Sequence, residues 1–190
     1  MDTYQALHAA ISSTRPIVQG TTPAQFDRPT PCTAWDVRAL LNHIVGTLWS
    51  AQALLTDTQP PHGLGPGGLP DTDLVGDNPI AAYKEGAAAA RAAAGAGEAL
   101  EESHQTPLGE MPGAGLAGFA SLDLLVHGWD LARATGQAAS FDEELVAHCF
   151  GFAQQVITDQ MRGPLIGSPV PVPDAAPPIE RLAGFMGRHP

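Results

Sequence analysis

The sequence is poor in cysteine, in basic residues and in long apolar runs. Two cysteines in 190 residues, Cys32 and Cys149, cannot form a disulfide framework, so we expect both thiols to be reduced in a cytoplasmic protein. Nine lysines and arginines against twenty acidic residues give a formal charge of −11, which repels nucleic-acid phosphates and anionic lipid surfaces. The apolar runs are too short to span a bilayer, and the N-terminus lacks the features of a signal peptide. We therefore expect neither nucleic acid nor a membrane as a partner.

The composition is that of a folded globular chain, with 44% hydrophobic and 15% charged residues. The length predicts one domain, residues 1–190, with a sizeable core. Glycine and proline concentrate in residues 57–79 and 104–115, which predicts two irregular loops. The longer loop is expected either to cover a site or to be mobile. Its histidine, His62, is placed to fold over a site, although an ordinary loop residue is the favoured interpretation.

Outside these loops, apolar residues recur at helical spacing. An interruption or kink is expected at Pro16, inside the first helix. No strand pattern is long enough to predict a sheet. The predicted fold class is therefore all-α, a helical bundle with long Gly/Pro-rich loops and a short C-terminal helix. Four of the predicted helices cover residues 2–20, 79–100, 115–135 and 178–187. Another begins after an N-cap at Thr33, and a further one begins at a capping box formed by Ser140 and Glu143.

Two of these helices carry the candidate site. Asp123 and His127 are four residues apart, so they share one helix face. His43 lies beside the apolar stripe of the second helix. Two imidazoles and one carboxylate can converge on a divalent metal and leave coordination positions open. The spacing alone is more typical of an ordinary helix pair or a hydrogen-bonded core histidine, but a carboxylate on so apolar a helix needs compensation.

Two further side chains lie near the candidate ligands in sequence. Asp130 can accept a proton from a metal-bound histidine, but we favour a structural role, capping the backbone or pairing with Arg133. Cys32 precedes the helix of His43 and would lie about 16 Å from it along a regular helix axis. We therefore favour Cys32 as a small, buried apolar residue rather than a metal ligand.

Two signatures in the sequence carry a family resemblance. Residues 29–43, Pro-Thr-Pro-Cys-Thr-Ala-Trp-Asp-Val-Arg-Ala-Leu-Leu-Asn-His, resemble the N-terminal domain of the mycothiol-dependent maleylpyruvate isomerase family, within the wider DinB/YfiT-like superfamily. Residues 123–136, which begin Asp-Leu-Leu-Val-His-Gly-Trp-Asp, look like its second signature. The ending Gly-Arg-His-Pro, residues 187–190, is similar to that of an actinobacterial metal-binding subgroup. The resemblance covers nearly the whole chain.

The resemblance implies a four-helix bundle that holds a divalent metal. Zinc is the first expectation for this metal, and nickel is the alternative. His43 and His127 match the family's ligand positions, and Asp123 stands where glutamate or histidine is common. The resemblance also implies mycothiol or a similar low-molecular-weight thiol as cosubstrate, and a small electrophile as substrate of a transferase or isomerase. The true isomerase carries an extra C-terminal domain for which this chain has no obvious room, so thiol chemistry is the broader expectation.

The sequence is also compatible with two other functions. Two histidines and a carboxylate also form the facial triad of non-haem iron oxygenases, although the all-helical pattern argues against the usual oxygenase folds. A non-catalytic metal-binding protein that acts by association is the other alternative. Exposed helical faces are compatible with a homodimer.

Overall fold

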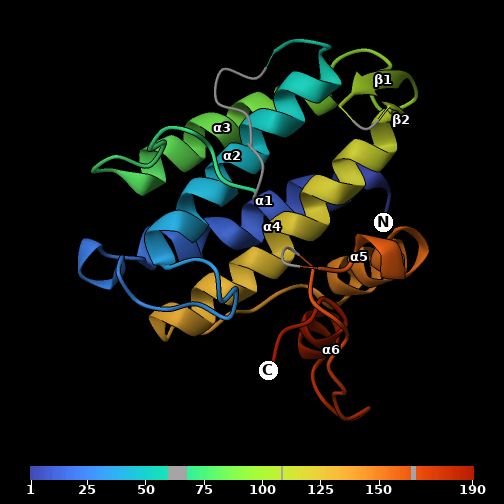
Figure 1. Ribbon diagram of the computed structural model, residues 1–190. Coiled ribbons are helices and arrows are strands. Elements are labelled where there is room, and N and C mark those ends of the chain that lie inside the picture. The colour runs from blue at the N-terminus through green and yellow to red at the C-terminus, as the bar shows by residue number, and fades with distance from the viewer. Residues whose placement is uncertain (60–67, 108, 164–165) are drawn as a thin grey trace.

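Four helices pack as a bundle in the computed structural model, which describes residues 1–59, 68–107, 109–163 and 166–190. Helix α2 lies against both α3 and α4, and α1 packs against α4 and α3 on the other side of the bundle (Figure 1). The prediction of an all-α four-helix bundle is confirmed. The bundle helices are α1 (Thr3–Gly20), α2 (Val37–Leu55), α3 (Pro79–Ala94) and α4 (Gly113–Thr135).

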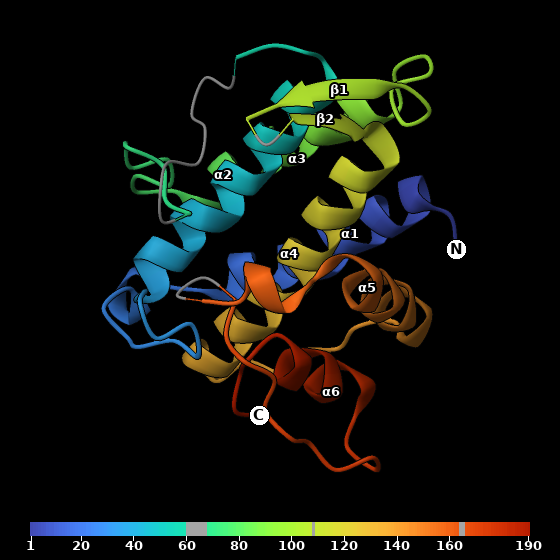
Figure 2. The ribbon, with the colours of Figure 1, turned by 45° about the vertical axis from the view of Figure 1, so that its right-hand side comes forward.

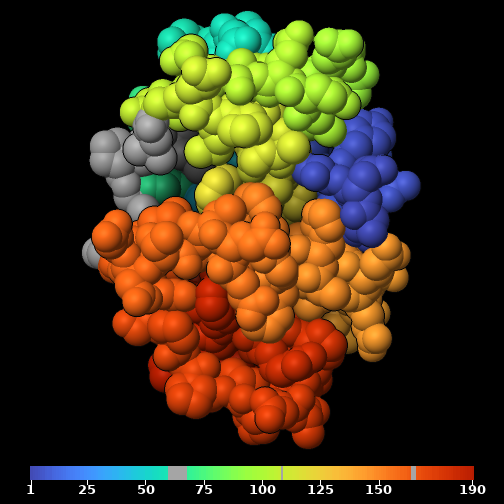
Figure 3. All heavy atoms as spheres, turned by 90° about the vertical axis from the view of Figure 1, so that its right-hand side faces the viewer, coloured from blue at the N-terminus to red at the C-terminus, as the bar shows by residue number. Residues whose placement is uncertain are grey.

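The smaller elements surround this bundle. Helices α5 and α6 lie against α4 on the side away from α3 (Figure 2). The segments after residue 140 form the lower part of that face, and the strands lie at its upper edge (Figure 3). No helix in the described ranges is long and apolar enough to cross a membrane. The smaller elements are α5 (Glu143–Val156), α6 (Pro178–Phe185), the 3₁₀ turns η1 (Pro23–Gln25) and η2 (Asp159–Met161), and strands β1 (Ser103–Thr106) and β2 (Gly109–Pro112).

Helix α4 is buried on almost every side, because α1, α2, α5 and α6 all pack against it. Its sequence matches this position, since leucine, alanine and glycine occupy all of its faces rather than one stripe. At Gly128 the helix approaches α1 so closely that an added Cβ would lie 2.9 Å from the hydroxyl of Thr14. The polar residues of α4 therefore sit inside the hydrophobic core.

The prediction of an irregular loop over residues 104–115 is wrong. Residues Ser103–Thr106 pair antiparallel with Gly109–Pro112, with His104 opposite Met111. Each strand has only four residues, too few for an alternating pattern to be recognised in the sequence. Helix α4 follows directly and begins at Gly113.

Several predicted helix boundaries are also wrong. Helix α2 begins at Val37, and its cap is Asp36 rather than Thr33, because the Asp36 carboxylate accepts the Ala39 N–H at 2.8 Å. Helix α5 begins at Glu143 with Asp142 as its cap, in place of Ser140. In both cases several capping residues stand close together, and the sequence does not rank them.

The end of α3 and the course of α1 also differ from the prediction. Helix α3 ends at Ala94, before the expected residue 100, because Gly95 and Gly97 follow and glycine disfavours helix. Helix α1 continues through Pro16 without interruption. The interruption predicted at Pro16 is therefore wrong.

The long loop over residues 57–79 is described only in part, and His62 lies outside the described residues. Its second half is attached to α2. Arg38 forms an ion pair with Asp73, and the Asn42 side-chain oxygen accepts the Leu74 N–H at 2.6 Å. These contacts bring Gly68 next to α2. The expectation that the loop covers a site or is mobile stays a prediction.

Candidate metal centre

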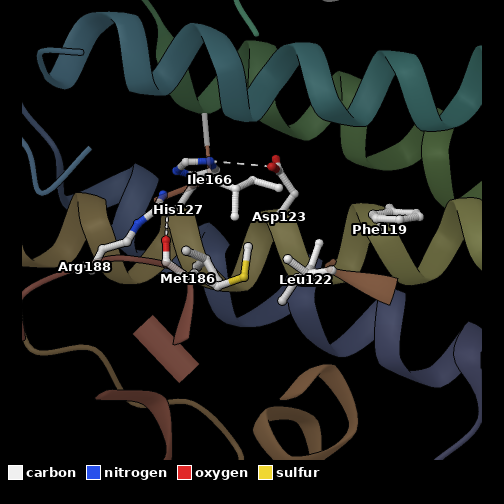
Figure 4. A pocket seen from close by; sticks show the side chains of 9 residues that line it. Phe119, Leu122, Asp123, His127, Ile166, Met186 and Arg188 are labelled. Atoms are coloured by element: carbon white, nitrogen blue, oxygen red, sulfur yellow. Dashed lines mark hydrogen bonds and ion pairs between the residues drawn. The ribbon is translucent and has the colours of Figure 1, made fainter. Parts of the chain in front are cut away.

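His43, Asp123 and His127 lie together where α2 crosses α4. Nε2 of His43 lies 2.9 Å from one carboxylate oxygen of Asp123. The other oxygen of Asp123 lies 3.5 Å from Nε2 of His127, one helical turn along α4 (Figure 4). The candidate donor atoms of all three residues lie within 4.8 Å of one another. The structure therefore brings together the three residues that the sequence singled out.

Nitrogen and oxygen ligands about 2.1 Å from a zinc ion are about 3.4 Å from each other. The separation between His127 and Asp123 is close to this value, and that between His43 and Asp123 is shorter, as in a direct hydrogen bond. The aspartate arm is one methylene shorter than glutamate, yet its two oxygens each face one imidazole. Two imidazoles and one carboxylate form a donor set of the kind that binds divalent cations.

The outer nitrogen of each imidazole faces a hydrogen-bond acceptor. Nδ1 of His43 lies 2.5 Å from the Gly68 carbonyl oxygen, and Nδ1 of His127 lies 3.0 Å from a carboxylate oxygen of Asp130. Carbonyl and carboxylate oxygens only accept, so each Nδ1 carries the hydrogen. Each Nε2 faces Asp123, where it can share a proton with the carboxylate or offer its lone pair to a metal cation. Histidine ligands of metals commonly show this arrangement.

Asp130 joins the site to the end of the chain. Its carboxylate is fully buried and receives the Arg188 guanidinium, with Nη2 at 2.9 Å and Nε at 3.3 Å. The predicted surface pair of Asp130 with Arg133 is wrong, because Arg133 lies over the Trp129 ring. The sequence carried no spacing signal for Arg188, which lies 58 residues from Asp130.

The three titratable groups change one another's pKa values. Burial alone would raise the pKa of Asp123, but the positive charges of His43 and His127 and the Thr47 hydroxyl hold it well below its usual range. Burial would lower the pKa of His43, yet the Asp123 charge and hydrogen bond raise it overall. Burial dominates at His127 and lowers its pKa, with the neighbouring His43 adding to the effect. The core thus favours an ionised carboxylate between the two rings.

Two hollows meet at Asp123, whose side chain is 30% exposed while those of His43 and His127 are 7% and 8% exposed. The first, the Arg188 hollow, has a volume of about 100 Å³ and opens between α4 and the C-terminal segment (Figure 4). The second, the α2–α4 groove, has a volume of about 220 Å³. A cation at Asp123 would therefore be open to small molecules from two sides. The Arg188 hollow is lined by Phe119, Leu122, Asp123, Val126, His127, Ile157, Ile166, Met186 and Arg188, and the groove by Thr47, Ser50, Ala51, Leu54, Leu116, Phe119, Ala120 and Asp123.

The two cysteines are not among the converging donors of the described residues. Cys32 is half-buried, and burial, helped by the charges of Asp130 and Asp123, raises the pKa of its thiol to about 11. Helix α2 starts only at Val37, so the distance expected from a straight helix does not apply, and Cys32 comes within the electrostatic reach of the site. Burial raises the pKa of Cys149 to about 12. Both thiols are protonated at neutral pH.

The comparisons with known proteins show the family of the chain. The family model described as mycothiol maleylpyruvate isomerase N-terminal domain matches residues 7–132, a range that contains all three converging residues. Two proteins described as uncharacterized, from two strains of Mycobacterium tuberculosis, are each 32% identical over 197 residues, covering 99% of this chain and 98% of the relative. No solved structure matches the chain. The chain belongs to the mycothiol maleylpyruvate isomerase N-terminal domain family, and its helical bundle is consistent with the DinB-like superfamily.

Proposed function

We propose that His43, Asp123 and His127 bind one divalent cation, zinc or alternatively nickel, and that the protein uses it to join or rearrange a low-molecular-weight thiol and a small electrophile. The observation that carries the proposal is the hydrogen bonding of the two rings: both Nδ1 atoms donate outward and both Nε2 atoms face the same carboxylate. The family supports mycothiol as the thiol. A transferase or isomerase of this type is the function that the site supports best.

The chain's own residues prepare this chemistry. The two imidazoles are neutral ligands and Asp123 contributes one negative charge, so a divalent cation would keep one net positive charge. A cation held there would lower the pKa of an approaching thiol and polarise an electrophilic substrate. Trp35 lies against both rings, with centroids 4.5 Å from His43 and 5.4 Å from His127, and limits the access of water from that side. The open sides are the two hollows at Asp123.

The groove offers a place for the electrophile. Its walls are mainly aliphatic and aromatic, and Thr47, Ser50 and Asp123 are its polar residues. An apolar group would bind there and exclude water, while its reactive carbon lies near the carboxylate end. In the reaction, the thiol sulfur bonds to that carbon, the thiol proton passes to solvent or a base, and any leaving group departs with its electron pair.

The first experiment replaces His127 by Ala and measures bound metal and helical content after purification without chelator and loading with zinc or nickel. We expect the variant to lose the metal, because one of the three ligands is removed, and to keep its fold largely unchanged. The control is His148→Ala, a histidine on α5, which should retain the metal. Wild-type protein that binds neither metal would refute the proposal. A histidine that is merely structural would lower stability and leave the metal content unchanged.

Catalysis is tested separately, with mycothiol and the thiol-reactive probe monobromobimane. The sulfur displaces bromide, and the adduct becomes fluorescent as the proton is released. Metal-loaded wild-type protein should accelerate adduct formation over His127→Ala. Equal rates, with metal bound to the wild type, would instead support a binding protein. Elemental analysis that finds iron would favour the oxygenase alternative, because two histidines and a carboxylate also suit iron(II).

A further inference from the structure

The end of the chain turns back into the core beside the candidate metal centre. Gly187 has a φ of +86°, a left-handed conformation that glycine adopts without strain. An added Cβ there would lie 2.5 Å from the backbone of Gly167. The Arg188 N–H then bonds to the Ala183 carbonyl at 2.9 Å. This tight turn directs the Arg188 side chain inward, where only 5% of the residue is exposed.

Arg188 donates hydrogen bonds to one carboxylate and one carbonyl inside the protein. Its Nε and Nη2 atoms donate to Asp130. Its Nη1 atom donates to the Met186 carbonyl at 2.9 Å (Figure 4). The same Asp130 oxygen that receives Nη2 also accepts the Nδ1 hydrogen of His127. A buried carboxylate without a cation would be costly. Arg188 thus supplies the charge that allows Asp130 to remain ionised next to His127.

We propose that Arg188 is a positioning residue of the metal site: through Asp130 it holds the hydrogen of His127 on Nδ1 and aims Nε2 at Asp123. This inference rests on the proposed function insofar as it concerns metal binding. The fork of the guanidinium fixes both oxygens of Asp130, so the carboxylate cannot rotate away from the imidazole. Residue 188 lies outside the range matched by the family model, residues 7–132. The C-terminal segment therefore completes a site whose ligands all come from the bundle.

A purely structural role for Arg188 is the alternative, and the chain offers a matched control for it. Arg162 also ties the C-terminal segment together, since its Nη1 donates to the carbonyls of Gly167 at 2.7 Å and Phe185 at 3.0 Å. Its guanidinium lies over the Phe185 ring, and none of its hydrogen bonds or ion pairs reaches Asp130 or His127. Replacing Arg162 loosens the same segment and leaves the Asp130 contacts in place.

The experiment compares Arg188→Met, Arg188→Lys and Arg162→Met with wild type in two readouts. Nitrogen-15 spectra of the imidazoles, recorded without metal at about pH 8, report which nitrogen of His127 carries the hydrogen. Competition with a chromophoric chelator reports zinc affinity. Arg188→Met should give a mixture of the two tautomers and bind zinc about 10- to 100-fold more weakly. Arg188→Lys should recover part of both signals, because it restores the charge without the fork.

The control decides between the two roles. Arg162→Met should keep the wild-type tautomer and zinc affinity even where its stability falls. The inference is overturned if Arg188→Met and Arg162→Met give the same tautomer and the same affinity. Wild-type protein that takes up no zinc or nickel would end the proposed function, while the tautomer comparison would still decide the role of Arg188. Should Arg188→Met fail to fold, the lysine variant carries the same comparison.

Discussion

The Thr47 hydroxyl gives the sharpest test of Asp123 as a ligand. Thr47 lies one turn after His43 on α2, is 6% exposed, and donates its hydroxyl hydrogen to Asp123 Oδ2 at 2.7 Å. Replacement by valine keeps the shape and removes this one hydrogen bond. The carboxylate then loses the donor that orients it between the two imidazoles.

The size of the effect follows from the contact. A hydrogen bond to a charged group contributes about 1.5–3 kcal/mol, and removing a group that orients a metal ligand costs about 10- to 100-fold in affinity. That range corresponds to about 1.4–2.7 kcal/mol. At a fixed excess of zinc, the stabilisation by metal should fall by the same amount, or about 3–10 °C of melting temperature for a chain of this size.

The assay measures thermal unfolding with and without zinc for wild type and Thr47→Val. The control is Thr14→Val, because Thr14 is also buried and donates to the Leu124 carbonyl on α4 at 3.0 Å. The control should lose about 0.5–1.5 kcal/mol of stability and keep the full zinc-induced shift. A Thr47→Val protein with the wild-type zinc shift would refute the reasoning, since Asp123 would then bind no metal or need no support from Thr47.

Three predictions concern the scaffold. The hydrogen bond to the Ala99 carbonyl outweighs the effect of burial and, with Asp57, raises the pKa of His104 above 6.5. Folding therefore favours the protonated imidazole, and this contribution to stability is lost as pH rises through the folded pKa. The stability difference between wild type and His104→Gln should therefore be larger at pH 6 than at pH 9. A pH-independent difference in urea unfolding would contradict this. Tyr83→Phe should cost about 0.5–1.5 kcal/mol, measured by urea unfolding, because the buried hydroxyl donates to a backbone carbonyl; no loss would mean that the bond contributes nothing. Gly136 has a φ of +72°, so Gly136→Ala should lower the free energy of unfolding by about 1–2 kcal/mol, and Gly136→Asn should lower it by less. Thermal unfolding measures both losses, and equal losses would count against a conformational cause.

The helices of the bundle could be predicted because their cause is local. Apolar residues at helical spacing in α2 and alanine in α3 favour helix whatever surrounds them, and Gly136 ends α4 as expected. The starts of α2 and α5 could not be ranked, because aspartate, serine and threonine are all good caps. The hairpin between α3 and α4 could not be predicted, because its two short strands are stabilised by pairing with each other and by their contacts with α2 and α4.

The sequence by itself determined the fold class and one of the contacts that matter at the site. Asp123 and His127 had to share a face, because four residues make about one helical turn. The family resemblance pointed to His43, and the crossing of α2 over α4 placed its imidazole opposite the carboxylate. No local pattern connects Asp130 with Arg188, or His43 with Gly68, since their pairing depends on where the chain returns after long excursions. The tertiary structure alone decided which nitrogen of each ring faces Asp123, because only packing brings an acceptor to the other nitrogen.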